Sequence, residues 1–93
     1  MTERERDIEK YFIWTVLSRG GLTYKFRSPT QRGVSDRIAC LPNGQTWFVE
    51  IKRPKGGYLS PIQEIFAQDM AALKQRYICL WTKEQINAWI VTT

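Results

Sequence analysis

Residues 36–52 read DRIACLPNGQTWFVEIK, and this stretch decides the fold. Two strand-like segments, 36–41 and 46–52, flank Pro42-Asn43-Gly44-Gln45. Because Asn-Gly accepts the positive φ values of a tight turn, the pattern predicts a β-hairpin. If Asn43-Gly44 is the centre of the turn, the numbers of paired residues sum to about 87. Asp36 would then lie opposite Ile51, within one residue of Glu50 and Lys52.

The segment before the hairpin predicts a helix and a strand. Thr2-Glu3-Arg4-Glu5 fits a capping box with Thr2 as the N-cap. Ile8, Phe12 and Val16 then recur at helical spacing, and Gly20-Gly21 is expected to end the helix. Apolar and polar side chains alternate over residues 22–27, which is typical of a strand.

The segment after the hairpin predicts a helix, a strand and a short helix. Ser60-Pro61-Ile62-Gln63 combines an N-cap, a proline at the first position and a capping box. The expected buried face of this helix consists of Ile62, Ile65, Phe66, Met70 and Leu73. A short apolar strand is expected over residues 77–81. The last element is a short helix that begins at the cap formed by residues 82–85 and runs through Trp89. The order α-β-β-β-α-β-α predicts an α/β fold, with a mixed sheet flanked by helices.

The bulk composition indicates a globular protein. The 93 residues, 43% of them hydrophobic, are expected to form one domain, 1–93. No apolar run is long enough for a membrane span, and the charged start lacks the apolar region of a signal peptide, so a cytoplasmic location is expected. Cys40 and Cys79 lie in apolar runs and are expected to be buried thiols in a reducing compartment.

The charged residues narrow the possible chemistry. The chain has no histidine, which excludes histidine-based triads, zinc sites and general bases. Seven basic but only two acidic side chains lie between Lys25 and Lys55, whereas the rest of the chain has seven of each. A basic concentration of this kind indicates either a polyanionic partner such as DNA or an ordinary solvated surface.

Three charged residues of the hairpin form a candidate active site. Glu50 and Lys52 are two residues apart on one strand, so they point to the same face. Asp36 is expected to lie on the neighbouring strand, about 4.8 Å away. Two close carboxylates repel each other, and a divalent cation such as Mg²⁺ between them would offset the repulsion and act as a Lewis acid on a phosphodiester. The alternative interpretation is an exposed strand face of alternating charge.

The chain also resembles a known family. Asp36, thirteen intervening residues and Glu50-Ile51-Lys52 are similar to the PD-(D/E)XK nuclease signature. The wider pattern resembles the VRR-NUC family of virus-type replication-repair nucleases in its stand-alone phage and bacterial form. The matching segments are Tyr24-Lys25-Phe26, Ser28-Pro29, residues 32–37, residues 47–52 and residues 59–63.

The resemblance implies a restriction-endonuclease-like fold and Mg²⁺- or Mn²⁺-dependent hydrolysis of phosphodiester bonds in branched DNA. A homodimeric Holliday junction resolvase, with a role in repair and recombination, is the expectation. Two alternatives stay open, which are a monomeric flap or end nuclease and a non-catalytic DNA-binding module on the same fold.

The resemblance also assigns roles to individual residues. Asp36, Glu50 and the Ile51 carbonyl match metal ligands, whereas Lys52 and Gln63 match a catalytic lysine and a glutamine of the site. A glutamate of the first helix is expected near the metal, either Glu9, which is preferred, or Glu5. Ser35 replaces the usual proline before the aspartate. The expected phosphate contacts are Lys25, Arg32, Arg37, Arg53 and Lys55.

Overall fold

The computed structural model describes residues 2–93. The helices and strands follow in the order α1 (Glu5–Ser18), β1 (Leu22–Lys25), β2 (Arg37–Cys40), β3 (Thr46–Ile51), α2 (Pro61–Ala72), β4 (Tyr77–Leu80) and α3 (Lys83–Ile90). The predicted order of elements is therefore confirmed, although β1 and β2 are shorter than expected.

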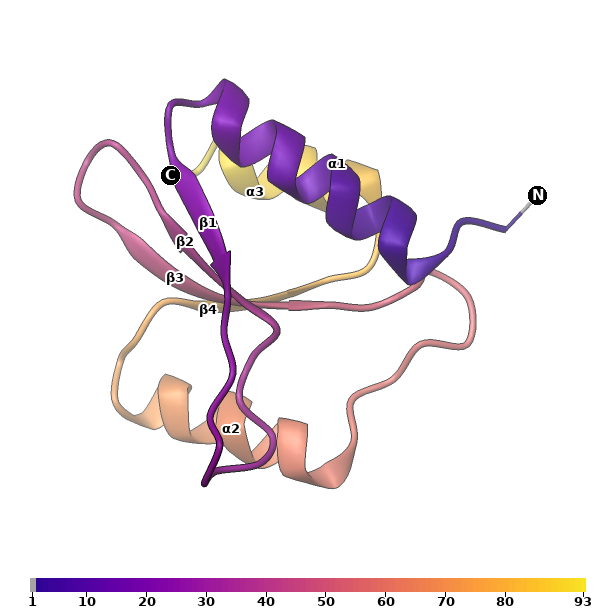
Figure 1. Ribbon diagram of the computed structural model, residues 1–93, viewed down its shortest axis with the longest axis vertical. Helices are drawn as coiled ribbons and strands as arrows, with labels where there is room; N and C mark the ends of the chain where they lie inside the picture. The colour runs from indigo at the N-terminus through magenta and orange to yellow at the C-terminus, as the bar shows by residue number, and fades with distance from the viewer. Residues whose placement is uncertain (1) are drawn as a thin grey trace.

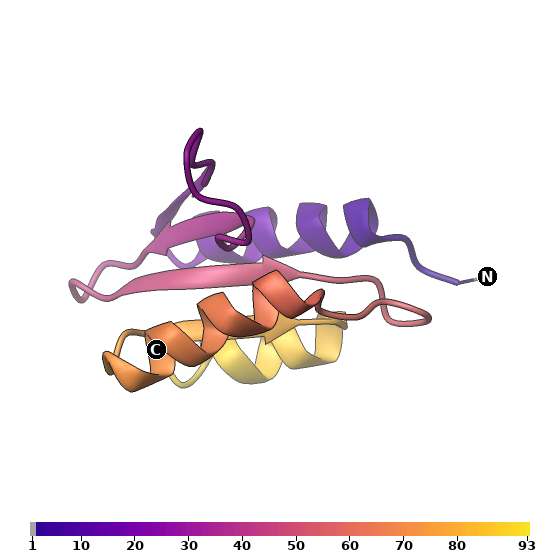
Figure 2. The same ribbon diagram turned by 90° about the horizontal axis from the view of Figure 1, so that it is seen from below.

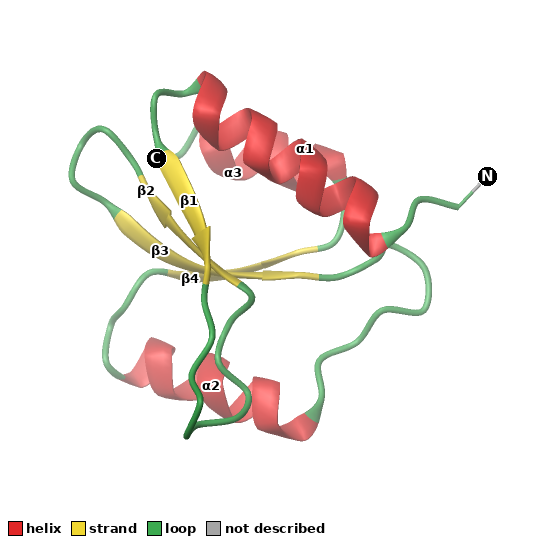
Figure 3. Cartoon of the chain, in the orientation of Figure 1, coloured by secondary structure: helices red, strands yellow, loops and turns green. Residues whose placement is uncertain are grey.

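One mixed sheet organises the molecule. Its strands lie in the order β1-β2-β3-β4, with β1, β2 and β3 antiparallel and β4 parallel to β3. Figure 1 shows α1 and α3 on one side of the sheet and α2 on the other. In Figure 2, which is seen from below, α2 lies in front of the sheet, whereas α1 and α3 lie behind it. Figure 3 shows the long loops that connect these elements.

The hydrophobic core lies between the sheet and the helices α1 and α3. The predicted stripe of α1 is confirmed, because Ile8, Phe12 and Val16 are fully buried. Phe12 stacks on Trp89 of α3, with 5.5 Å between the ring centroids. Burial of such side chains contributes roughly 1.5–3 kcal/mol each, so this layer supplies most of the apolar stabilisation.

The hairpin register differs from the prediction by one residue. Arg37 pairs with Val49 and Ile38 with Phe48, so paired numbers sum to 86. The reason is the length of the turn. Leu41 donates its N–H to the Gln45 carbonyl at 2.9 Å, so the turn itself consists of the three residues 42–44 between them. Only Gly44 of the loop has a positive φ, of 84°, as in three-residue hairpin loops. Asp36 directly precedes the paired residues, and by the same sum it falls opposite Glu50.

The helix N-termini show one wrong prediction and two confirmed ones. The first helix begins at Glu5 with Arg4 as the N-cap, not Thr2. Asp7 accepts a hydrogen bond from the Arg4 N–H at 3.0 Å. The acidic residue of the capping box is therefore Asp7, and not Glu5 as predicted. In contrast, Ser60 and Thr82 cap α2 and α3 as predicted, by accepting from backbone N–H groups three residues ahead.

Burial of α2 and of the cysteines was predicted wrongly. No residue of α2 is buried, and Ile65 and Leu73 are 56% and 64% exposed. Cys40 is an exposed free thiol and Cys79 is half-buried. Their apolar neighbours in sequence indicated burial, but the α2 side of the sheet is only partly covered. Among residues 2–93, no helix is both long and apolar enough to cross a lipid bilayer.

Candidate active site

Adjacent strands bring Asp36 and Glu50 together. Glu50 is the penultimate residue of β3 and is 1% exposed, and Asp36 directly precedes β2. The Asp36 carboxylate accepts the Ile51 N–H at 2.9 Å, which holds it against β3. The two carboxyl groups are close enough that Asp36 raises the pKa of Glu50. The one-residue shift of the hairpin therefore produces the pair that the predicted register only approximated.

The environment of Glu50 disfavours its charge. Burial raises the pKa of the Glu50 carboxyl to about 9, and the negative charge of Asp36 acts in the same direction. The ammonium of Lys52 lowers this pKa but does not compensate. Without a further cation, Glu50 holds a proton at neutral pH. A buried acidic pair of this kind is suited to bind a divalent cation, which would replace that proton.

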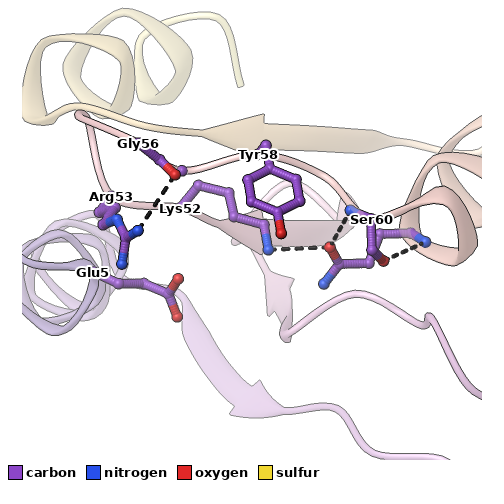
Figure 4. Close-up of a pocket in the computed structure, with 8 residues that line it drawn as sticks. Glu5, Lys52, Arg53, Gly56, Tyr58 and Ser60 are labelled. Carbon is purple, nitrogen blue, oxygen red and sulfur yellow. Dashed lines mark hydrogen bonds between the residues drawn. The ribbon is translucent and has the colours of Figure 1, made fainter.

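Lys52 points toward the acidic pair and is held in place. Its Nζ lies 3.9 Å from the Glu50 Oε2 and donates a hydrogen bond to the Gln63 Oε1 at 3.0 Å. The Lys52 side chain is only 15% exposed. Figure 4 shows the side chain running from β3 toward the start of α2, where Ser60 lies. The ammonium thus has a fixed position beside the carboxylates.

Gln63 has both of the roles that the sequence left open. Its Oε1 accepts the Ser60 N–H at 2.9 Å, which completes the capping box of α2. The same oxygen accepts from Lys52, and its Nε2 donates to the Glu50 Oε2 at 3.3 Å. The cap therefore fixes one amide group that orients both a carboxyl and an ammonium group of the site.

The two glutamates of α1 lie in different environments. Glu9 forms an ion pair with Arg37, with 3.0 Å between its Oε2 and the Arg37 Nη1. Glu5 lines two cavities, one beside Lys52 and the other beside Asp36. Partial burial and the nearby Asp36 charge raise the pKa of the Glu5 carboxyl. Glu9 also lines the cavity beside Asp36, but of the two glutamates only Glu5 lines the cavity beside Lys52.

The residues present fit a divalent cation that also binds water and substrate. Asp36 and Glu50 supply two adjacent carboxylates, and the Ile51 carbonyl follows on the same strand. Within residues 2–93, no group of three or more acidic, cysteine or histidine side chains could hold a metal ion by itself. Mg²⁺ is commonly bound in this way, through one or two carboxylates and the oxygens of water and phosphate.

The residues predicted to contact phosphates differ in their exposure to solvent. Lys25, Arg32 and Lys55 are exposed, as such contacts require. Arg53 is also exposed, but its guanidinium donates to the carbonyls of Lys55 and Gly56. Arg37 is buried, where it binds Glu9 and the Thr23 hydroxyl, so the structure does not place it among the surface cations.

The buried contacts of Arg37 were missed from the sequence. Thr23, Glu9 and Arg37 come from three different elements, and no spacing in the sequence links them. Tyr58 was missed as well, although it lines the cavity beside Lys52. Its position directly after Gly56-Gly57 and before the helix cap was the available signal.

Comparisons with known proteins agree with this geometry. No family model matches the sequence. A stretch of 51 residues is 53% identical to "Putative nuclease p44" of Acyrthosiphon pisum secondary endosymbiont phage 1. The match covers 55% of this chain and 55% of that protein, so it spans about half of the relative's length. A solved structure described as a VRR_NUC domain matches with a TM-score of 0.87, at 24% identity and over 92% of both chains. The chain therefore has the fold of a VRR_NUC domain, which is the family that its sequence resembles.

Proposed function

We propose that the chain is a metal-dependent DNA endonuclease that hydrolyses phosphodiester bonds in branched DNA. The observation that carries this proposal is the acidic pair Asp36 and Glu50 on adjacent strands, with the ammonium of Lys52 held beside it. The VRR_NUC fold and the partial match to a phage protein named as a nuclease support the same conclusion.

Asp36, Glu50 and the Ile51 carbonyl would hold Mg²⁺ or Mn²⁺. When bound, the ion supplies Lewis-acid activation of water and neutralises charge on the scissile phosphate. Asp36 is oriented for this role by the Ile51 N–H, and Glu50 by the amide of Gln63. Both carboxylates are therefore preorganised before substrate arrives, which lowers the cost of reaching the reactive geometry.

Lys52 would stabilise the negative charge that develops on the phosphate, or orient the attacking water. Its hydrogen bond to Gln63 removes much of the freedom of a lysine side chain, and its limited exposure weakens screening by solvent. An electrostatic group fixed in this way needs little reorganisation during the reaction.

Between the two glutamates of α1, we favour Glu5 as the outer carboxylate of the site. Glu5 borders both cavities, the one beside Asp36 and the one beside Lys52, whereas Glu9 borders only the cavity beside Asp36 and neutralises the buried Arg37. Removing Glu9 would leave that guanidinium without its charged partner, which is costly for a buried group. Glu9 would thus support the fold, while Glu5 acts through water on the cation.

The exposed cations Lys25, Arg32 and Lys55 would contact the DNA backbone. Contacts to phosphates fix the position of DNA without reading its sequence, and their strength falls steeply with salt. No recognition helix for the major groove is expected from the sequence. We therefore expect selection of substrates by shape rather than by sequence, in the cytoplasm of a phage-infected or bacterial cell.

Paired cuts in a four-way junction would require two copies of the chain. The exposed apolar surface of α2 supports a homodimer, and the adjoining groove of about 690 Å³ carries charges of both signs, Arg32 and Asp69. In a two-fold interface, the exposed apolar surface of α2 in one copy would pack against the same surface of the other. This arrangement would place two active sites on one junction.

The test is cleavage of labelled DNA by the purified protein. Four-way junctions, flaps and linear duplexes are incubated with Mg²⁺, with Mn²⁺ or with EDTA, beside the variants Lys52→Ala and Lys10→Ala. We expect metal-dependent cutting of junctions that is lost in Lys52→Ala and retained in Lys10→Ala, because Lys10 is an exposed lysine of α1 outside the proposed site. Cutting of flaps by a monomer would replace the resolvase with a flap nuclease. Binding without cutting in either metal would contradict the enzyme and leave a DNA-binding module.

A further inference from the structure

A large aromatic side chain borders the site without packing against the fold. Tyr58 is 74% exposed and lines a cavity of about 270 Å³ together with Glu5, Lys52 and Gln63. Figure 4 shows its ring beside the Lys52 side chain. Among residues 2–93, no other aromatic ring contacts that of Tyr58. An exposed ring contributes little to stability, so the fold itself does not explain this position.

The loop that carries Tyr58 is rigidly built. The Arg53 guanidinium donates to the Lys55 carbonyl at 3.0 Å and to the Gly56 carbonyl at 3.4 Å, which closes the loop on itself. A Cβ on Gly57 would lie 2.5 Å from the Arg53 carbonyl oxygen, so a side chain at this position would force the loop to open. These contacts give the backbone that leads into Tyr58 a defined turn beside the cavity.

Resting on the function proposed above, we propose that Tyr58 stacks against a nucleobase that has lost a stacking neighbour and lies next to the scissile phosphate. The floor of the cavity offers the ammonium of Lys52 for the phosphate, and its rim offers an aromatic face for the adjoining base. Stacking of a base on an aromatic side chain depends little on which base it is. This agrees with the sequence, which predicts no recognition helix.

This position of Tyr58 has a consequence for the choice of substrate. Within a duplex, both faces of a base are covered by its neighbours, and no face is free for a protein ring. A base at a branch point, flap or frayed end has lost one neighbour and offers a free face. Tyr58 therefore selects DNA whose stacking is interrupted at the cleaved bond, independently of how many copies of the chain act together.

Binding without metal tests the stacking directly. Flap oligonucleotides carry 2-aminopurine at the unpaired position next to the cleaved bond, and its fluorescence is measured with protein in EDTA. We expect quenching by the wild type, by Tyr58→Phe and by Trp14→Ala, and loss of the quenching in Tyr58→Ala. Trp14 is a matched control because it is exposed too but lies nine residues from Glu5 along α1, about 14 Å. Equal quenching in Tyr58→Ala would overturn the proposal.

A double-mutant cycle, in which cleavage rates are measured with Mg²⁺, assigns the contact of Tyr58 to one base. The four combinations pair wild type or Tyr58→Ala with a normal or an abasic nucleotide at that position. Stacking predicts that either change alone lowers kcat/KM by about 5-fold to about 150-fold, and that the second change adds little. Independent effects in an active wild type would refute the stacking but keep the nuclease. If the wild type cuts no DNA at all, the proposed function is refuted. The fluorescence measurement then still tests the contact between Tyr58 and the base.

Discussion

The two faces of the sheet differ in what they contribute. Beneath α1 and α3, Phe12, Ile51 and Trp89 are buried in one continuous core. On the opposite face, α2 has no buried residue, and Ile65 and Leu73 remain exposed. Yet α2 supplies Gln63, whose amide contacts both Glu50 and Lys52. One face therefore holds the fold together, whereas the other positions the candidate active site and leaves apolar surface for a partner.

The difference between the two faces of the sheet shows how a chain of this size can combine stability with a polar site. A small domain buries only a modest fraction of its surface, so its core is concentrated on one side of the sheet. The acidic pair lies at an end of the same sheet, where Glu50 is buried and Asp36 is half-buried. Substitutions on the two faces should consequently have separable effects on stability and on activity.

The largest expected effect is on the stability of the core face. Phe12→Ala removes a fully buried ring that stacks on Trp89 and should lower the free energy of unfolding by about 3–5 kcal/mol. Ile65→Ala on α2 should change it by less than about 0.5 kcal/mol. Urea denaturation of the two variants measures this difference. Similar losses in both would contradict the division between the faces.

The next effect should appear in activity and leave stability nearly unchanged. Lys52→Ala removes the fixed ammonium and should lower kcat by about 100-fold to about 1000-fold, as when a preorganised charge-stabilising group is lost. Lys10→Ala, which removes an exposed lysine of α1 outside the proposed site, serves as the control. Steady-state cleavage is measured beside the melting temperature of each variant. A loss of activity that merely followed a lower melting temperature would make Lys52 structural.

The pH dependence of stability should sharpen the contrast between the site and the core. Because the pKa of Glu50 is raised to about 9, the folded chain keeps a proton that the unfolded chain loses above about pH 4.5. Stability in EDTA should therefore fall as pH rises from about 5 to 9, by at most about 1.4 kcal/mol per pH unit, and then level off.

Glu50→Gln is the control for this pH dependence, since a glutamine cannot lose a proton. The decline of the melting temperature between pH 5 and 9 should disappear in this variant. In the wild type, added Mg²⁺ should reverse part of the decline, because the ion binds the ionised carboxylate. A wild-type melting temperature that is independent of pH in EDTA would contradict the protonated Glu50.

The smallest expected effect concerns the apolar surface of α2. Ile65→Arg introduces a charge into the proposed two-fold interface and should weaken self-association by about 10-fold or more, without unfolding the chain. Sedimentation equilibrium measures the dissociation constant, and Leu17→Arg on α1 is the control for an exposed leucine. A monomeric wild type would remove the homodimer and leave α2 open for another partner.

Several features of the molecule were determined by the sequence itself. The period-two pattern of β3 places Glu50 and Lys52 on one face, because strand geometry alternates side chains regardless of the surroundings. Ser60 and Gln63 predicted the start of α2, since capping depends on backbone groups only three residues away. The order of elements and the mixed sheet followed from such local patterns.

Other features were decided only by the tertiary structure. The hairpin register depends on which loop residue takes a positive φ, and Gly44 alone does so, which moved Asp36 to its place opposite Glu50. The burial of Arg37 beside Glu9 joins residues 28 positions apart. The exposure of α2 reflects what covers the sheet rather than how apolar the helix is. Each of these depends on contacts between segments, which composition and spacing do not encode.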